Sequence, residues 1–242
     1  MLYIVATPIG NLGDFSYRAV QVLREADVIA CEDTRRTRIL LNHFEIPIPR
    51  FFISYREQTE RKAGRRLIEL LEEGKTVALC ADSGYPGISD PGYRLVCDAI
   101  EKGIQLEVIP GASAVPVALI ISGLPSSSYT FKGFPPRKSG AIRRFFEEEK
   151  DMPHTLIFFE SPVRLVKTLT LAAEVLGDRK AAVCIELTKK FEGVSRGFLT
   201  DLIASFTGQK IKGEVTIVIA GNNPKFIRTE NDVATKEFGH DK

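Results

Sequence analysis

Short apolar runs alternate with amphipathic segments along the first half of the chain. The runs are nearly unbroken, which is typical of strands buried on both faces of a sheet; they cover 2–7, 28–31, 76–80 and 105–109, with a further extended piece at 51–55. Apolar residues at helical spacing follow the runs, over 17–26, 39–44, 57–73, 93–100 and 113–122. Strands that alternate with helices in this way predict a parallel sheet.

Residues that commonly cap helices stand before three of these segments. Ser16, Asp33 and Asp90 occupy positions where an N-cap is expected, and Pro91 falls in a first helical turn, where its missing N–H costs nothing. The stretch from Cys80 to Gly92 is therefore read as the end of a buried strand, a long loop rich in Gly, Pro, Ser and Asp, and the start of a helix.

The second half of the chain mixes strands and helices less regularly. Strands are predicted near 129–133, 155–160, 181–186 and 213–220, and 191–198 is a candidate for a further strand. Helices are predicted over 139–150, 162–176 and 199–206. A turn over 208–213 would make a hairpin-like connection, so antiparallel pairs are expected in this half.

A Gly/Pro/Ser-rich stretch over 123–128 predicts a domain boundary. The fold class is therefore α/β with two α/β domains. We expect a mostly parallel sheet in an N-terminal domain over 1–124, a mixed sheet in a C-terminal domain over 125–222, and a polar tail over 223–242.

The composition is that of a soluble globular protein. Of the 242 residues, 44% are hydrophobic and 26% are charged. There is no signal-peptide pattern and no apolar run of bilayer-spanning length, so a cytoplasmic protein without a membrane partner is expected. The four cysteines are scattered and the three histidines lack metal-like spacing, so neither disulfides nor a metal site is expected.

Positive charge is clustered, although the net charge is only +2. The clusters lie at 35–38, 61–66, 137–144 and 189–190. Each could be a solvated helix face, but several clusters beside predicted loops favour a phosphate-rich partner.

The loops at the predicted strand ends carry glycines, hydroxyls and carboxylates. They cover 7–14, 32–38, 82–92, 110–114, 160–162 and 187–196, and 212–214 lies at a strand start. Neither the G-x-G-x-x-G nor the G-x-x-x-x-G-K-[ST] pattern is present, so Rossmann and P-loop sites are not supported. Without a pair of nucleophile and base such as Ser and His, these loops favour holding and orienting a preformed group donor.

Six motifs together resemble those of the tetrapyrrole methylase superfamily, the class III methyltransferases. They are 6–14 (ATPIGNLGD), 32–35 (EDTR), 81–92 (ADSGYPGISDPG), 109–114 (IPGASA), 159–164 (FESPVR) and 186–192 (ELTKKFE). The second and the last resemble the branch that methylates the ribose 2′-hydroxyl of a cytidine in 16S ribosomal RNA. The resemblance implies two α/β domains with S-adenosylmethionine in the cleft between them, a homodimer, and ribosomal RNA of the small ribosomal subunit as substrate.

The resemblance also implies a set of donor-binding residues. They are Pro8, Ile9, Gly10, Gly84, Tyr85, Pro86, Ile88, Ser113, Ala114, Leu187, Thr188, Glu214, Val215 and Thr216. Three positions depart from the family pattern, where a small residue is expected in place of Tyr85, a histidine in place of Arg56 and a second glutamate in place of Gly193. Tyr85 is therefore a candidate for narrowing the donor pocket or for stacking on a ligand.

Methyl transfer to a ribose hydroxyl requires in-line alignment and removal of a weakly acidic proton. Candidates for the base or for a cation that favours the alkoxide are Glu32, Asp33, Asp82 and Lys189. Asp33 has the alternative role of a helix cap. Candidates for phosphate contacts are Arg35, Arg36, Arg38, Arg137, Lys138 and Lys190, and Phe134 or Tyr55 could stack a base.

Two alternatives stay open at this point. A methylase of the same superfamily could act on a tetrapyrrole carbon or a protein side chain, and a large apolar acceptor pocket would favour that reading. A non-catalytic RNA-binding protein could have kept the fold, which a failure to bind the donor would favour. The basic clusters favour RNA over a tetrapyrrole.

Overall fold

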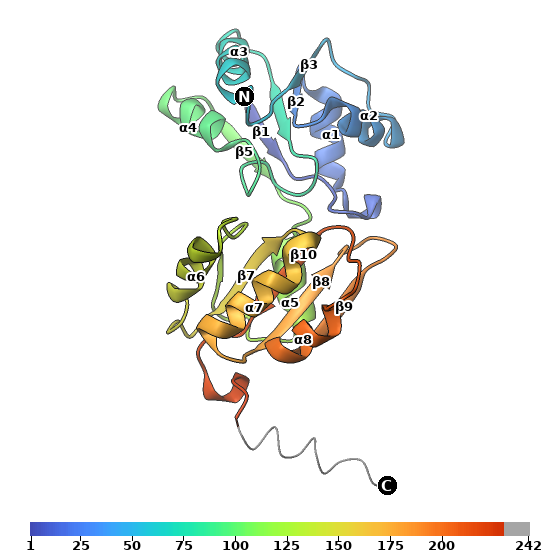
Figure 1. The fold of residues 1–242 in the computed structure, drawn as a ribbon. Coiled ribbons are helices and arrows are strands. Elements are labelled where there is room, and N and C mark those ends of the chain that lie inside the picture. Colours follow the sequence, from blue (N-terminus) through green and yellow to red (C-terminus); the bar gives the residue numbers. More distant parts are fainter. Residues whose placement is uncertain (230–242) are drawn as a thin grey trace. The chain divides into compact units, whose positions relative to one another are not determined.

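The computed structural model describes residues 1–229, and the chain divides into two compact units, Met1–Ser113 and Ala114–Lys242 (Figure 1). The division falls one helix earlier than the boundary expected after residue 124. The reason is helix α5 (Ala114–Ser122), which packs against strands of the second unit's sheet. Its apolar residues therefore belong to the second unit, and the Gly/Pro/Ser stretch that follows it is a loop within that unit.

The first unit is built on a five-stranded parallel sheet with the order β3-β2-β4-β1-β5. Its strands are β1 (Leu2–Val5), β2 (Val28–Cys31), β3 (Phe51–Ser54), β4 (Val77–Cys80) and β5 (Leu106–Ile109). The central strands β2 and β4 are buried along their whole length, as their unbroken apolar sequences predict.

Helices cover both faces of this sheet. They are α1 (Tyr17–Glu25), α2 (Thr34–His43), α3 (Glu60–Glu72) and α4 (Tyr93–Glu101). Leu67 of α3 and Leu95 of α4 share one core with Leu79, whereas Leu23 of α1 and Leu41 of α2 share the other core with side chains of the opposite sheet face. This is the doubly wound arrangement that alternating strands and helices favour.

Two of the three predicted helix caps are confirmed, and the third is wrong. Ser16 accepts a hydrogen bond from the backbone N–H of Ala19, and Asp33 accepts one from that of Arg35. Helix α4 instead begins after Gly92, at φ +151°, where a Cβ would lie 2.8 Å from the backbone nitrogen of Gly87. The loop folds back on itself there, so the helix starts later than Asp90.

The second unit contains a mixed five-stranded sheet with the order β6-β7-β10-β8-β9. Its strands are β6 (Tyr129–Phe131), β7 (Thr155–Glu160), β8 (Lys180–Ile185), β9 (Gly193–Phe198) and β10 (Val215–Ile219). β6 and β7 are parallel, and the other pairs are antiparallel. The sequence-based expectation of an α/β fold with a mixed second sheet is therefore confirmed.

Helices α6 (Ser139–Glu147), α7 (Leu165–Leu176) and α8 (Leu199–Phe206) share one core with β7, β8 and β10. The expected hairpin turn over 208–213 is not a hairpin turn, because α8 stands between β9 and β10 in the chain. The hairpin is formed by β8 and β9 instead, and its loop is 186–192. Glu186, Thr188 and Lys189 lie in that loop.

The described part of the polar tail has some structure. A 3₁₀ turn covers Pro224–Phe226, and the Arg228 guanidinium lies 3.2 Å from the carboxylate of Asp178. The remainder of the predicted tail, 230–242, lies outside the described residues. Within 1–229 no helix is long and apolar enough to cross a bilayer, and no group of three or more His, Cys, Asp or Glu side chains could hold a metal ion.

Candidate active site

The loops after β1, β4 and β5 are joined by hydrogen bonds at the carboxyl edge of the first sheet. Thr7 and Gly84 exchange two backbone hydrogen bonds of 2.9 and 3.1 Å, and the Thr7 hydroxyl donates to the carbonyl of Ala81. The Tyr85 hydroxyl accepts a hydrogen bond of 3.0 Å from the backbone N–H of Gly111. Because neighbouring parallel strands end at the same edge, segments far apart in the sequence meet there.

Tyr85 therefore has a structural role that its sequence position did not reveal. Its side chain spans from the loop after β4 to the loop after β5, and a small residue could not make this hydrogen bond to Gly111. The departure from the family pattern therefore links the loops after β4 and β5 in this chain. A role in stacking on a ligand stays a prediction.

Asp33 is held by its own helix and by the arginine next to it. Its carboxylate accepts a hydrogen bond from the backbone N–H of Arg35 and lies 2.6 Å from the guanidinium of the same residue. The hydrogen bonds from Arg35 hold the pKa of Asp33 well below its usual range. A carboxylate with so low a pKa is a weak base, so the geometry favours the capping role.

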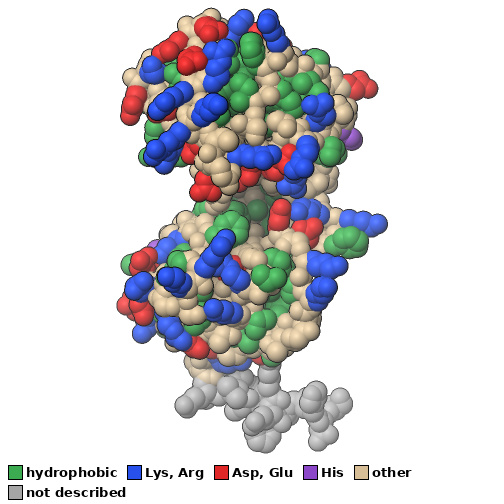
Figure 2. Space-filling view, turned by 45° about the horizontal axis from the view of Figure 1, so that its top comes forward, with side chains coloured by type: hydrophobic (Ala, Val, Ile, Leu, Met, Phe, Trp, Pro, Cys, Tyr) green, Lys and Arg blue, Asp and Glu red, His purple; other side chains and the backbone are tan. Residues whose placement is uncertain are grey.

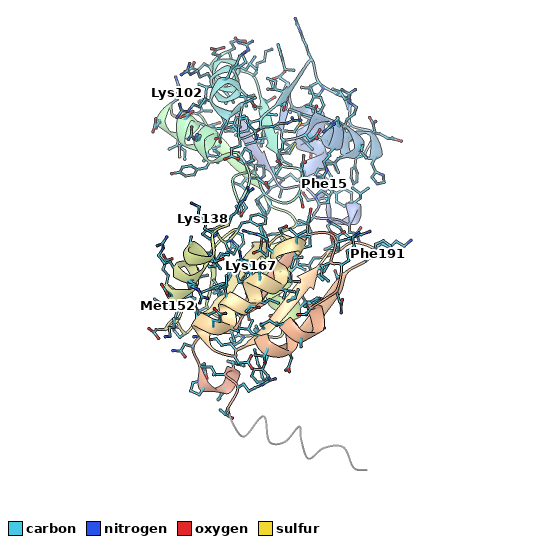
Figure 3. The ribbon with its side chains drawn as sticks, viewed as in Figure 1. Phe15, Lys102, Lys138, Met152, Lys167 and Phe191 are labelled. Carbon is cyan, nitrogen blue, oxygen red and sulfur yellow. The ribbon has the colours of Figure 1, made fainter. Side chains whose placement is uncertain are left out.

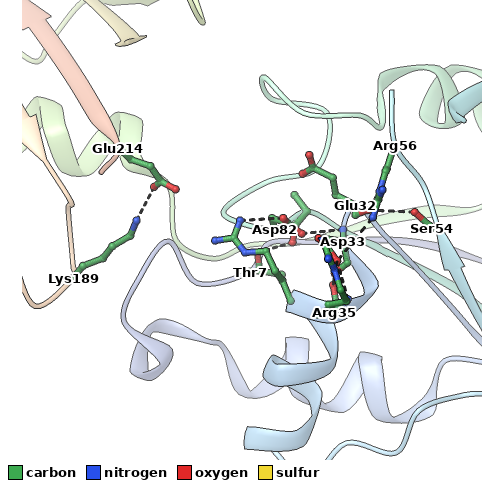
Figure 4. A network of polar contacts seen from close by, with 12 residues as sticks. Thr7, Glu32, Asp33, Arg35, Ser54, Arg56, Asp82, Lys189 and Glu214 are labelled. Atoms are coloured by element: carbon green, nitrogen blue, oxygen red, sulfur yellow. Dashed lines mark hydrogen bonds and ion pairs between the residues drawn. The ribbon is translucent and has the colours of Figure 1, made fainter. Parts of the chain in front are cut away.

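Asp82 connects the loops after β2 and β4 (Figure 4). One of its oxygens accepts a hydrogen bond of 3.0 Å from the backbone N–H of Asp33, and the other lies 3.1 Å from the guanidinium of Arg36. Both carboxylate oxygens of Asp82 are thus engaged in holding neighbouring groups.

Glu32 differs from the two aspartates. Burial and the negative charge of Asp82 raise its pKa above the ordinary value, although nearby arginines oppose the shift. Its backbone carbonyl accepts a hydrogen bond of 2.9 Å from Nε of Arg56 and one of 3.4 Å from the hydroxyl of Ser54 (Figure 4). Glu32 is therefore the carboxylate of this group best suited to accept a proton near neutral pH.

The second unit contains a lysine held by two carboxylates. Nζ of Lys189 lies 2.9 Å from Glu186 and 3.1 Å from Glu214. Burial lowers the pKa of Lys189, but the hydrogen bonds to both glutamates outweigh it, so the pKa lies above the ordinary value. The side chain is therefore a fixed cation at neutral pH, suited to stabilise negative charge and not to accept a proton.

The loop that carries Lys189 is tightly folded. Glu186 and Thr188 have φ values of +52° and +65°, a region that L-residues rarely adopt, and the backbone N–H of Thr188 donates to the Glu192 carboxylate over 2.6 Å. Such conformations persist only where surrounding contacts enforce them, and they cluster at functional sites.

Gly213 makes room for the Glu186 side chain. At φ +88°, a Cβ on Gly213 would lie 2.4 Å from three atoms of Glu186. We expect Gly213→Ala to displace Glu186, release Lys189 and lower the turnover rate by about tenfold or more. Kinetics of the purified variant, with Gly208→Ala (φ +79°, open space) as the matched control, would test this. Equal losses in both variants would mean that strain, not the lost contact, is responsible.

The arm over 132–138 is fixed by a buried ion pair. Glu160 is almost fully buried and accepts hydrogen bonds from Arg164 and from the hydroxyl of Thr168. Arg164 also donates to the backbone carbonyls of Pro135 and Pro136, over 3.2 and 3.0 Å. The FESPVR motif thus positions the segment that presents Arg137 and Lys138.

The candidate RNA-contacting residues have different surroundings. Arg35 and Arg36 are paired with Asp33 and Asp82, Arg38 lies over the ring of Phe52, and Lys190 lies over that of Phe191. Arg137 and Lys138 are exposed. Lysine and arginine side chains are spread over the surface of both units (Figure 2).

Of the two aromatic candidates for stacking, Phe134 is 56% exposed, with its ring 5.5 Å from that of Phe159. Tyr55 is 1% exposed and its hydroxyl bonds to Glu60, so the structure contradicts the expectation that it could stack a base. Its side chain belongs to the core between the sheet and α3.

The candidate donor-binding residues fall in both units. Those of the first unit lie on the joined loops: Pro8, Ile9, Gly10, Gly84, Tyr85, Pro86, Ile88 and Ser113. Ala114, Leu187, Thr188, Glu214, Val215 and Thr216 lie in the second unit. Their role as a donor site stays a prediction. Sequence reasoning missed the parts played by Thr7, Glu186 and Gly213, although Glu186 stands in the same motif as Lys189.

Comparison with known proteins agrees with these motifs. The family described as "Tetrapyrrole (Corrin/Porphyrin) Methylases" matches residues 1–203. A protein of Halalkalibacterium halodurans named ribosomal RNA small subunit methyltransferase I is 49% identical over 224 residues, which cover 93% of this chain and 77% of that protein. The protein of the same name from Thermotoga maritima is 43% identical, over 91% of this chain and 98% of its own length.

Solved structures show the same fold at low sequence identity. The methyltransferase CobJ superposes with a TM-score of 0.68 at 15% identity, covering 91% of this chain and 94% of its own. Diphthine synthase gives the same TM-score at 18% identity, covering 91% and 90%. With the family match over most of its length and relatives above 40% identity, this chain belongs to the tetrapyrrole methylase family.

Proposed function

We propose that the protein transfers a methyl group from S-adenosylmethionine to the ribose 2′-hydroxyl of a cytidine in 16S ribosomal RNA, acting as a cytoplasmic homodimer on the small ribosomal subunit. The observation that carries this proposal is Glu32, a half-buried carboxylate with a raised pKa close to Arg36 and Arg56. This surrounding suits a substrate that brings both a weakly acidic hydroxyl and phosphates. The names of the relatives support the same substrate class.

Methylases of this family use S-adenosylmethionine, whose sulfonium carries the reactive methyl group. The joined loops of the first unit suit such a donor, because Gly84, at φ +75°, turns the loop after β4 against Thr7 and so brings 8–10 and 84–88 together at the sheet edge. We assign the donor contacts to 8–10, 84–88 and 113–114, with 187–188 and 214–216 from the second unit.

The chain's own residues then have distinct tasks. Glu32 accepts the proton of the 2′-hydroxyl, and the freed electron pair of the oxygen forms the new bond to the methyl carbon as the carbon–sulfur bond breaks. Lys189 stabilises the negative charge that develops on that oxygen. Asp33 and Asp82 are positioning residues, which hold the helix start and the arginines around Glu32.

The proposed base makes the reaction depend on pH in a definite direction. Glu32 must be deprotonated, so the rate should fall as the pH drops through its raised pKa. Arg56 is among the charges that lower this pKa, so Arg56→Gln should move the acidic limb of the log kcat profile to higher pH. The profile measured for both proteins checks this, and an unshifted limb would argue against Glu32 as the titrating group.

The exposed arm should contribute charge to RNA binding. Neutralising Arg137 and Lys138 together should reduce the slope of log affinity against log salt by up to about 2, since each lost phosphate contact removes about one unit. Binding to small subunits, titrated at several salt concentrations, measures the slope. Lys167→Gln, on α7 of the same unit, serves as a charge control. If this control changed the slope equally, the prediction that Arg137 and Lys138 contact RNA phosphates would be wrong.

The test of the function uses radiolabelled S-adenosylmethionine and purified small ribosomal subunits that lack 2′-O-methylation, followed by nuclease mapping. Label on one cytidine ribose supports donor, reaction and substrate together. Donor binding without label on RNA would favour a tetrapyrrole or protein acceptor. A protein that binds RNA but no donor would be the non-catalytic alternative.

A further inference from the structure

Phe191 is a large apolar side chain that the fold leaves in water. Its exposed fraction is 77%, and it stands at the far end of the hairpin loop 186–192, two positions after Lys189 (Figure 3). Neither the core of the second unit nor the proposed catalysis uses the ring. A single exposed apolar side chain is common on protein surfaces, but this one stands in the same loop as Lys189 and Lys190.

The loop holds the backbone around Phe191 in one conformation. The backbone N–H of Lys189 donates to Glu186 over 3.0 Å, and that of Glu192 donates to Lys189 over the same distance. The Glu192 carboxylate closes the loop by accepting from the backbone N–H of Thr188. The backbone of Phe191 lies between these two turns and is held in one conformation. The exposed ring therefore loses little conformational entropy when a ligand binds to it.

The charged side chains near the Phe191 ring indicate the chemistry of its ligand. Nζ of Lys190 lies 5.7 Å from the ring centroid, and Lys189 is a fixed cation in the same loop. An aromatic face next to cations fits an unpaired nucleotide, whose base stacks on the ring and whose phosphate pairs with the lysine. A single ring among charged residues is too small for a stable contact between protein copies.

We propose that Phe191 is a stacking platform for the base of an unpaired nucleotide in the RNA substrate, at or next to the methylated residue. This inference rests on the proposed function and deepens it. It explains how the site selects a nucleotide that is out of its helical stack, because a paired base cannot offer its face to the ring.

The test compares variants of Phe191 that lose the aromatic ring with variants that keep one. On small subunits that lack 2′-O-methylation, Phe191→Leu and Phe191→Ala should lower kcat/KM by about tenfold or more, whereas Phe191→Tyr and Phe191→Trp should retain most of it. Met152→Ala removes an exposed apolar side chain from the loop before β7, a strand that pairs with β6 and β10 and not with β8 or β9, and should have no effect. Donor affinity, measured by calorimetry, should be the same in all variants.

Salt dependence separates stacking from charge. Phe191→Leu should weaken RNA binding at every salt concentration with an unchanged slope, whereas Lys190→Met should reduce the slope. Wild-type kinetics for Phe191→Leu, or a change in oligomeric mass with unchanged RNA affinity, would overturn the platform and leave the proposed function standing. Absence of methylation by the wild-type protein would overturn both.

Discussion

Replacing Glu32 by glutamine is expected to lower kcat for methyl transfer by about 10²- to 10⁴-fold, the range that a general base contributes. Glutamine keeps the shape of the side chain, and the backbone carbonyl that Arg56 and Ser54 hold is unaffected. The loss should therefore fall on the proton transfer. Single-turnover rates at saturating donor and RNA measure it, with calorimetry showing that donor affinity is retained.

Asp33→Asn is the matched control for this variant. Asparagine also caps helices, so its side-chain oxygen can still accept the hydrogen bond from the backbone N–H of Arg35. We expect at most a small loss of rate, since the low pKa of Asp33 excludes it from proton transfer near neutral pH. If Asp33→Asn lost as much activity as Glu32→Gln, Glu32 could not be assigned as the base in preference to Asp33.

The difference between these two neighbours shows what the sequence could and could not reveal. The motifs 32–35 and 81–92 place Glu32, Asp33 and Asp82 after predicted strands. The apolar runs predict the parallel sheet that brings these strand ends together. The low pKa of Asp33 comes from its sequence neighbour Arg35, whereas the raised pKa of Glu32 comes from burial and from the charge of Asp82, which is far away along the chain. No local pattern contains the effect of Asp82 on Glu32.

The mistakes have the same physical origin. Asp90 has the sequence of an N-cap, but the close approach of Gly92 to Gly87 places the helix start later. Tyr55 was considered as a ring that could stack a base, yet its ring lies in the core beside α3. In each case tertiary packing overrides a local preference, whereas Ser16 and Asp33, whose caps involve neighbours in sequence, were predicted correctly.

Replacing Lys189 by methionine is expected to lower kcat by about 10²- to 10³-fold, the cost of removing one group that stabilises a developing oxyanion. Methionine keeps the length of the side chain, so the change removes charge with little loss of packing. The glutamates on either side hold the lysine protonated, so Lys189→Arg should restore part of the rate. Lys190→Met, one position along, should raise KM for the RNA and leave kcat nearly unchanged. If instead Lys189→Met raised KM alone, the lysine would be a phosphate contact, and the stabilising charge would have to come from the arginines around Glu32.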